Sequence, residues 1–215
     1  MLGYPLPLLL AVVMNELRRG RGLHSALAYL PVVMPPVAAI LLWRVFYDAS
    51  PDGLFNTALG WAGLGPYPWI QDPGWALPSV VLLATWSAAG ATVIIYLAAL
   101  TRIPPELYEA AEVDGAGILR RVWHVTLPQL RGVLLVTLIL QLISTFQVFT
   151  EPFLLTDGGP ANATITVMLL IYRYAFGAGG GGNYGAAAAL SLMLAGFLAL
   201  FSALYFRLTR PWAST

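Results

Sequence analysis

The chain of 215 residues is strongly apolar, because hydrophobic residues make up 59% of it and charged residues only 10%. A soluble domain averages about 25% charged residues, so this composition excludes an ordinary soluble fold and indicates that lipid covers much of the surface. The net charge of +1 gives no sign of a nucleic-acid partner. The chain has no cysteine, which excludes disulfides and thiol chemistry.

The apolar runs predict an all-α bundle that crosses a membrane several times. A bilayer core about 30 Å thick requires roughly 20 apolar residues in a helix. The first run, over 1–17, is only a partial span, and Pro31, Pro35 and Pro36 predict a kink or a late start in the second run. The chain is therefore expected to form a single transmembrane domain over 1–215, with full spans at residues 28–47, 77–100, 132–153 and 186–206.

The two segments 48–76 and 154–185, which lie between spans, are expected to form loops on the outer side. Residues 48–76 are rich in Gly, Pro, Asp and Trp, and we expect their tryptophans at the membrane interface, namely Trp61, Trp69 and Trp75. The glycine-rich run 177–183 predicts a flexible loop. It is no phosphate loop, because no Gly-Lys-Ser/Thr follows it.

Arginine placement sets the predicted orientation. Arginines gather in alternate loops, before residue 28, within 101–131 and after residue 206: Arg18, Arg19, Arg21, Arg102, Arg120, Arg121, Arg131, Arg207 and Arg210. By the positive-inside rule these segments are cytoplasmic. The loop 101–131 and the C-terminus are thus predicted to face the cytoplasm.

The loop 101–131 is a polar island in the apolar chain. Four of the ten acidic residues lie within nine of its positions: Glu106, Glu109, Glu112 and Asp114. Pro104-Pro105 ends the incoming helix and suits the first turn of a new one. Gly115 and Gly117 then break the run, and a second short helix is predicted over 118–125, with Pro128 as its end.

The first of these short helices presents a small, apolar face. Leu107, Ala110, Ala111 and Asp114 share one side at three- and four-residue spacing. An acidic helix fits an anionic inner leaflet poorly, whereas a helix-in-groove contact with another protein explains a small-residue face. The alternative is a solvated linker at the membrane surface.

Polar side chains in the span 132–153 are candidates for a transport pathway. Polar groups within a membrane tend to face a cavity or a partner helix. The candidates are Gln141, Ser144, Thr145 and Gln147, together with the aromatic faces of Phe149 and Tyr172. Amides, hydroxyls and rings suit a sugar, although hydrogen bonding between helices is the commoner use of such groups.

The sequence offers no catalytic or metal-binding constellation. An intramembrane enzyme would need paired acids, a Ser/His pair or metal ligands within the spans. His24 and His124 are instead expected at the cytoplasmic surface, and Glu151 has no acidic neighbour. We therefore predict a chain that is not an enzyme and has no metal site.

The polar island resembles the signature loop of the permeases of binding-protein-dependent, type I ABC importers. The residues that carry the resemblance are Glu109, Ala110, Ala111, Asp114, Gly115, Ala116, Val125, Leu127 and Pro128. The family prefers Ile at the position of Val125. Segments on both sides are similar to the carbohydrate branch, of the maltose and glycerol-phosphate type, for example Phe146–Phe149, Leu155–Pro160 and Tyr184–Ala186.

This resemblance implies a function and a set of partners. The chain would be the permease of an ATP-driven importer of a sugar or polyol in a bacterial cytoplasmic membrane. The loop would be a coupling helix that enters a cleft on an ATPase, with Glu109 as an anchor and Gly115 as the turn. The implied partners are two ATPase domains, a second permease in a heterodimer, an extracytoplasmic solute-binding protein and the lipid bilayer. ATP and Mg would bind to the ATPase, and this chain would hold no cofactor.

Other interpretations remain open at this point. The solute could instead be an amino acid, phosphate or a polyamine. Members of the family usually have six spans, so four spans and a partial one suggest a chain truncated at its N-terminus or a misassigned start. An inactive fragment is the third alternative. The outer loops 48–76 and 154–185 are the expected landing surface for the binding protein.

Overall fold

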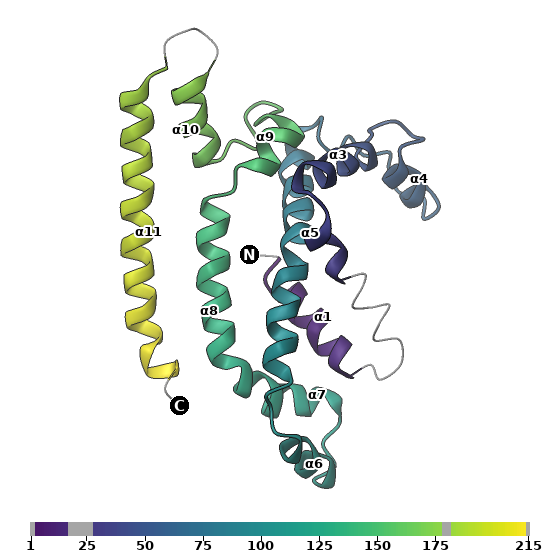
Figure 1. The fold of residues 1–215 in the computed structure, drawn as a ribbon. Helices are drawn as coiled ribbons and strands as arrows, with labels where there is room; N and C mark the ends of the chain where they lie inside the picture. The colour runs from purple at the N-terminus through teal and green to yellow at the C-terminus, as the bar shows by residue number, and fades with distance from the viewer. Residues whose placement is uncertain (1–2, 17–27, 178–181, 214–215) are drawn as a thin grey trace. The chain divides into compact units, whose positions relative to one another are not determined.

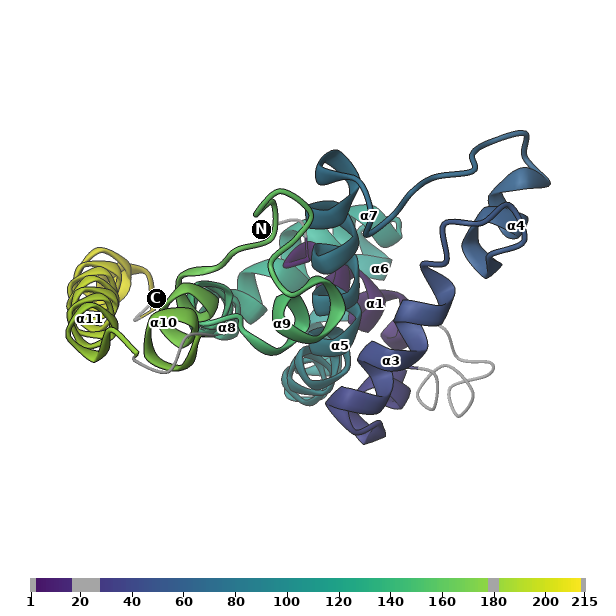
Figure 2. The same cartoon turned by 90° about the horizontal axis from the view of Figure 1, so that it is seen from above.

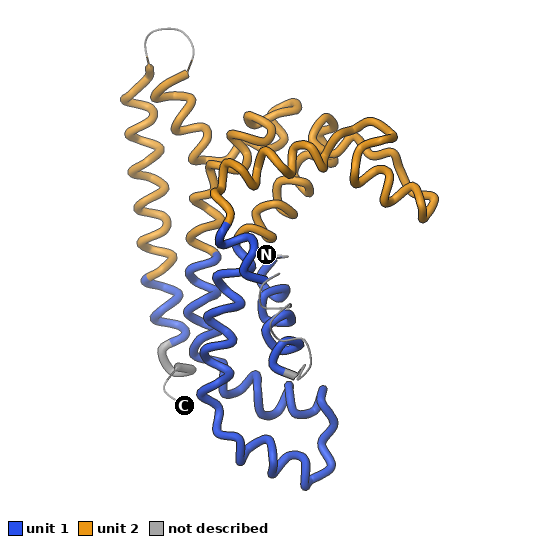
Figure 3. The backbone as a smooth tube through the Cα atoms, turned by 45° about the vertical axis from the view of Figure 1, so that its right-hand side comes forward, with its two compact units in different colours: residues 1–33, 88–141, 203–215 blue, residues 34–87, 142–202 orange. Residues whose placement is uncertain are grey.

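The computed structural model describes residues 3–16, 28–177 and 182–213, and this part of the chain contains helices and turns but no strand. It divides into two compact units, coloured separately in Figure 3. Unit 1 comprises 1–33, 88–141 and 203–215, and unit 2 comprises 34–87 and 142–202. Three helices each contribute to both units: α5 (Pro73–Leu100), α8 (Leu127–Phe146) and α11 (Tyr184–Ala213).

The core of unit 1 joins α1 (Pro5–Glu16) to parts of α5 and α8. Its buried side chains include Ala11, Met14, Val93, Tyr96, Leu100, Ile103 and Leu130. Hydroxyl groups add polar ties between the helices, because Tyr4 donates to the carbonyl oxygen of Leu134 at 2.6 Å. The hydroxyls of Tyr96 and Thr137 lie 2.8 Å apart. Each of these groups would be costly in an apolar interior without a partner.

Close packing in unit 1 centres on Gly90 of α5. A Cβ atom at this position would lie 2.5 Å from the carbonyl oxygen of Ala28 and 2.6 Å from a methyl carbon of Val32. Real Cβ atoms essentially never come so near to other atoms. The helical residues 28–33 therefore approach α5 at a distance that only glycine permits.

Unit 2 has an aromatic core. It contains α3 (Pro36–Phe46), α4 (Leu54–Gly60), α9 (Thr150–Thr156) and α10 (Val167–Phe176). Helix α3 contacts both α4 and α9, and its proximity to α4 is visible from two directions (Figures 1 and 2). Buried aromatic and aliphatic side chains fill the space between these elements: Ile40, Trp43, Tyr47, Trp69, Val80, Leu83 and Leu155.

The predicted span 28–47 is not one continuous helix. Its helical parts cover 28–33 and 36–46, and the helix is interrupted at Met34 and Pro35. The backbone of Pro35 has φ −56° and ψ 132°. Pro36 then takes the first position of α3, where its missing N–H costs nothing. Among the described residues three helical stretches rather than four reach membrane-spanning length: Pro73–Leu100, Ile118–Phe146 and Tyr184–Thr209.

The predicted span 132–153 also differs from the structure. Helix α8 ends at Phe146, and α9 begins only at Thr150. Pro152 explains the break, since within one helix it would remove the bond to the carbonyl of Val148 and clash with it. In the structure Pro152 falls in the first turn of α9, where it needs no hydrogen-bond partner.

Candidate functional site

The loop 101–131 forms a helical hairpin-like module within unit 1. It consists of α6 (Pro105–Val113), α7 (Ile118–Arg121) and η1, a π-helical turn at Val122–Thr126. Helices α6 and α7 lie side by side in both views (Figures 1 and 2). Pro104 is extended and Pro105 opens α6, so the helix start predicted from the proline pair is confirmed.

Gly115 makes the turn that separates the two short helices. Its φ is +74°, a left-handed conformation that costs other residues about 1–2 kcal/mol. The N–H of Gly115 donates to Glu112 O at 3.0 Å, and the N–H of Ala116 donates to Ala111 O at 2.9 Å. This pair of bonds is the Schellman motif, which satisfies carbonyls at the end of a helix.

Pro128 does not end the second short helix, contrary to the sequence prediction. The helical path is continuous from Ile118 to Phe146. In a regular α-helix Pro128 would clash with the carbonyl of His124. The widened π turn lies directly before it, and there the N–H of Leu127 donates to Val122 O, five residues back. The second half of the loop is thus the beginning of the membrane-length helix.

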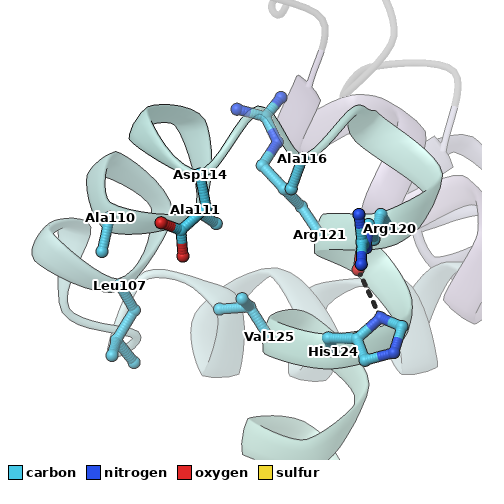
Figure 4. A pocket seen from close by; sticks show the side chains of 9 residues that line it. All are labelled: Leu107, Ala110, Ala111, Asp114, Ala116, Arg120, Arg121, His124 and Val125. Atoms are coloured by element: carbon cyan, nitrogen blue, oxygen red, sulfur yellow. Dashed lines mark hydrogen bonds between the residues drawn. The ribbon is translucent and has the colours of Figure 1, made fainter.

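A cleft of about 370 Å³ lies between α6 and the segment formed by α7 and η1. Figure 4 shows its lining, with the predicted small face of α6 on one side and side chains of α7 and η1 on the other: Leu107, Ala110, Ala111, Asp114, Ala116, Arg120, Arg121, His124 and Val125. The shared helical face predicted from spacing is therefore confirmed. His124 Nδ1 lies 3.0 Å from Arg120 O, within its own helical segment.

Two side-chain contacts fasten α6 to the neighbouring helical segment. Glu112 forms an ion pair with Arg121, and the hydroxyls of Tyr108 and Thr126 lie 3.1 Å apart. Neither contact was predicted from the sequence. Opposite charges nine residues apart across a glycine turn only weakly predict an ion pair. No sequence pattern predicts the contact between the two hydroxyls.

The remaining signature residues fall at defined places in the same module. Glu109 is exposed on α6, outside the lining of the cleft. Val125 is half-buried and packs against the core of unit 1. Leu127 and Pro128 occupy the first turn of α8. The fold therefore brings Val125 and the Ala110–Ala111 pair to one cleft, while Glu109 is exposed outside it.

The candidate pathway residues are distributed over both units. Gln141 is half-buried on the part of α8 that belongs to unit 1, and Ser144 and Thr145 are exposed on the part that belongs to unit 2. Gln147 follows the last residue of α8, and its N–H donates to Ile143 O at 3.2 Å. The predicted stripe therefore stops where the helix stops.

Phe149 and Tyr172, the predicted aromatic candidates, do lie together in unit 2. Their ring centroids are 5.2 Å apart. Phe153 stacks on Phe149 at 5.0 Å, and Phe176 continues the contact from Tyr172 at 5.4 Å. We call these four side chains the aromatic row. Tyr172 and Phe176 remain exposed, so ring faces are available for contact.

Asn56 organises the loop 48–76, a role that no sequence pattern predicted. Its Nδ2 lies within 3.1–3.3 Å of the carbonyl oxygens of Asp48, Ser50 and Tyr67. Its Oδ1 accepts from the N–H of Tyr67 at 2.9 Å and from Nε1 of Trp69 at 3.0 Å. The expectation of an interfacial Trp69 is wrong, because this ring is 9% exposed in the aromatic core.

An open groove of about 700 Å³ lies on unit 2. Its polar side chains include Arg44, Asp48, Gln71, Thr156 and Asp157, and Phe153 contributes an apolar wall. The backbone N–H of Ser50 donates to Asp48 Oδ1 at 2.8 Å and lowers the pKa of that carboxyl group.

The side chain of Arg173 stabilises the turn that contains Asp157. Arg173 donates to the carbonyl oxygen of Asp157 at 2.5 Å. Its guanidinium also lies 3.6 Å from the carboxylate of the same residue. The arginines at 18, 19 and 21, His24, Ala178 and the glycines at 179–181 lie outside the described residues.

Over residues 3–212 the sequence matches the family described as "Binding-protein-dependent transport system inner membrane component". The chain belongs to this family. As a membrane component of a transport system it is not an enzyme. It is 38% identical to the trehalose/maltose transport system permease protein MalF of Thermococcus litoralis over 154 residues, 72% of this chain and 52% of that protein.

Other relatives agree with this placement. The lactose transport system permease protein LacF of Rhizobium radiobacter is 38% identical over 164 residues, 74% of this chain and 54% of that protein. A permease chain of a bacterial alginate ABC transporter, solved with an alginate pentasaccharide-bound periplasmic protein, matches with a TM-score of 0.87 and 29% identity. That match covers 99% of this chain and 74% of the solved one. The chain spans about half the length of the curated relatives.

Proposed function

We propose that this chain is a permease subunit of an ATP-driven importer that moves a sugar or polyol across the bacterial cytoplasmic membrane. In this proposal an extracytoplasmic binding protein delivers the solute, and a second permease completes the pathway. Two ATPase domains, which bind ATP and Mg, drive transport, and one of them attaches to this chain through the loop 101–131. Family membership and the geometry of that loop support the proposal.

The observation that carries the proposal is the continuity of the loop with α8. Helix α6 has no buried residue, and only Tyr108 and Ala111 on it are half-buried. It is fastened to a helical segment that runs unbroken from Ile118 to Phe146. A partner that pushes on α6 would therefore act directly on a membrane-length helix, as coupling requires.

The solute class rests on the relatives and on the aromatic row. The similar proteins are named for trehalose and maltose, for lactose and for alginate. Exposed rings at Tyr172 and Phe176 offer flat apolar faces, and the amide of Gln147 offers neutral donors and acceptors. Sugars present CH faces and hydroxyl groups, so they match both features.

The test of coupling is a pull-down of the ATPase. The chain is co-expressed with the second permease and the ATPase encoded beside it, and wild type is compared with Glu109→Lys and Gly115→Asp. We expect both variants to insert in the membrane and to lose the ATPase. A Cβ atom at Gly115 would meet no neighbouring atom within 4 Å, so Gly115→Asp would cause no steric clash. Its effect would come from the positive φ, which side-chain-bearing residues adopt at a cost.

Gly117→Ala is the matched control for the turn. Gly117 has φ −66°, which any residue adopts, and its Cβ would also meet open space. This variant should retain the ATPase like wild type. Equal retention of the ATPase by wild type, Glu109→Lys and Gly115→Asp would overturn the proposed role of the loop.

The solute class is tested through the binding protein. Maltose, lactose, trehalose and glycerol, with glutamate, phosphate and spermidine as the comparison set, are added to the purified binding protein encoded beside this chain. A ligand stabilises the protein that binds it, so a sugar should raise its melting temperature. A rise with glutamate, phosphate or spermidine alone would contradict the sugar assignment.

A further inference from the structure

The two contacts that fasten α6 to the neighbouring segment form matching pairs. Tyr108 and Glu112 are four residues apart, and so share one face of α6. Their partners, Thr126 and Arg121, are five residues apart on the opposing segment. Each contact therefore spans the gap between the same two elements, at two heights along α6.

The π turn η1 is what allows both partners to face α6. In an α-helix, with 3.6 residues per turn, side chains five positions apart point about 140° away from each other. A π turn closes its hydrogen bonds five residues apart, so residues at that spacing lie nearly one above the other. Arg121 precedes η1 and Thr126 ends it. The widened turn thus places Arg121 and Thr126 on one side.

Burial indicates that these contacts are fixed parts of the module. The side chain of Arg121 is 13% exposed and that of Glu112 is 63% exposed. Thr126 is 2% exposed. A mostly buried guanidinium and a buried hydroxyl both need hydrogen-bond partners, and Glu112 and Tyr108 each supply one.

We propose that Tyr108–Thr126 and Glu112–Arg121 lock α6, α7 and η1 into a rigid bracket on α8. In this arrangement α6 does not swing about Gly115, and a displacement of α6 is transmitted to the membrane-length helix. The four side chains are positioning residues for coupling. The inference rests on the proposed function, since it assumes that the ATPase acts on α6.

The first test is a charge swap in the complete transporter, reconstituted with its ATPase, second permease and binding protein. Glu112→Arg places two cations together and should lower the solute transported per ATP hydrolysed by about fivefold. The double variant Glu112→Arg/Arg121→Glu restores opposite charges and should recover most of the ratio. Arg121→Glu alone, which places two anions together, should lower the ratio as Glu112→Arg does, so recovery in the double variant serves as the internal control.

The second test asks whether the bracket moves as one body. The chain has no cysteine, so Glu112→Cys/Arg121→Cys can be bridged by a short bifunctional thiol reagent, with cysteine-free partner subunits. A rigid bracket predicts that the bridged transporter still couples transport to ATP hydrolysis. Loss of transport on bridging, with activity in the unbridged double variant, would show that α6 must swing and would overturn the proposal.

Failure of this inference is distinguishable from failure of the proposed function. If the loop does not bind the ATPase, the pull-down already fails to separate wild type from Glu109→Lys. If the loop binds but the bracket is wrong, the pull-down succeeds, while the charge swap shows no recovery or bridging stops transport.

Discussion

Asn56 illustrates how one buried amide can determine the shape of a loop. It is 3% exposed and joins the backbone at Asp48, Ser50 and Tyr67 to the indole of Trp69. Asn56→Ala would leave the N–H groups of Tyr67 and Trp69 buried without an acceptor. The expected loss is about 3 kcal/mol of unfolding free energy, measured as a lower thermal midpoint in detergent.

Two further variants separate the causes of that loss. Asn56→Asp keeps the acceptor for Trp69 but sets a carboxylate against carbonyl oxygens, so we expect it to be destabilising as well. Thr57→Ala removes only an exposed hydroxyl 3.5 Å from Pro51 O and should leave the midpoint within about 0.5 kcal/mol of wild type. If the melting curve of Asn56→Ala overlays that of wild type, the hydrogen bonds of Asn56 do not stabilise the loop 48–76.

Residue-scale prediction from sequence succeeded where chain geometry alone dictates the outcome. Gly115 and Pro105 could be placed because a left-handed turn and a fixed φ are local properties. Asn56 and Trp69 could not, since their partners lie up to 13 residues away and depend on how the loop folds back. An asparagine in a Gly- and Pro-rich segment reads equally well as an exposed turn residue.

Packing between helices is tested at Gly90 of α5. Gly90→Ala would push a methyl group into the carbonyl of Ala28, which is backbone and cannot rotate away. We expect a loss of about 1–3 kcal/mol from overpacking, seen in the same thermal measurement. Gly132→Ala on α8 meets nothing within 4 Å and should be neutral or stabilising, because alanine favours a helix. If the two variants melt alike, residues 28–33 do not pack on α5 as described.

The element-scale errors share one physical source. Apolar length alone predicted single spans over 28–47 and 132–153, but Pro36 and Pro152 each needed a place in a first helical turn. The helix is therefore interrupted just before each of these prolines. Pro128 gave the opposite error, because a π turn, which no local sequence pattern announced, let the helix continue through it.

At the scale of the whole chain, charge placement predicts which ends of the long helices face the cytoplasm. The described arginines at 102, 120, 121, 131 and 207 all belong to unit 1. Unit 2 contains the loops predicted to be outer, the described aspartates at 48, 52, 72 and 157, and the arginines at 44 and 173. An inner leaflet with anionic lipids favours the arginine-bearing side. Most described arginines thus lie in unit 1, and the described aspartates other than Asp114 lie in unit 2.

Cysteine labelling checks this orientation directly, because the chain has no cysteine of its own. Trp61 is 88% exposed in unit 2 and Leu119 is 77% exposed in unit 1. In cells that lack the partner ATPase, a membrane-impermeant maleimide should label Trp61→Cys in intact spheroplasts. It should label Leu119→Cys only after permeabilisation. The reverse pattern would put α6 outside the cell, beyond the reach of any ATPase, and would overturn the proposed coupling together with the predicted topology.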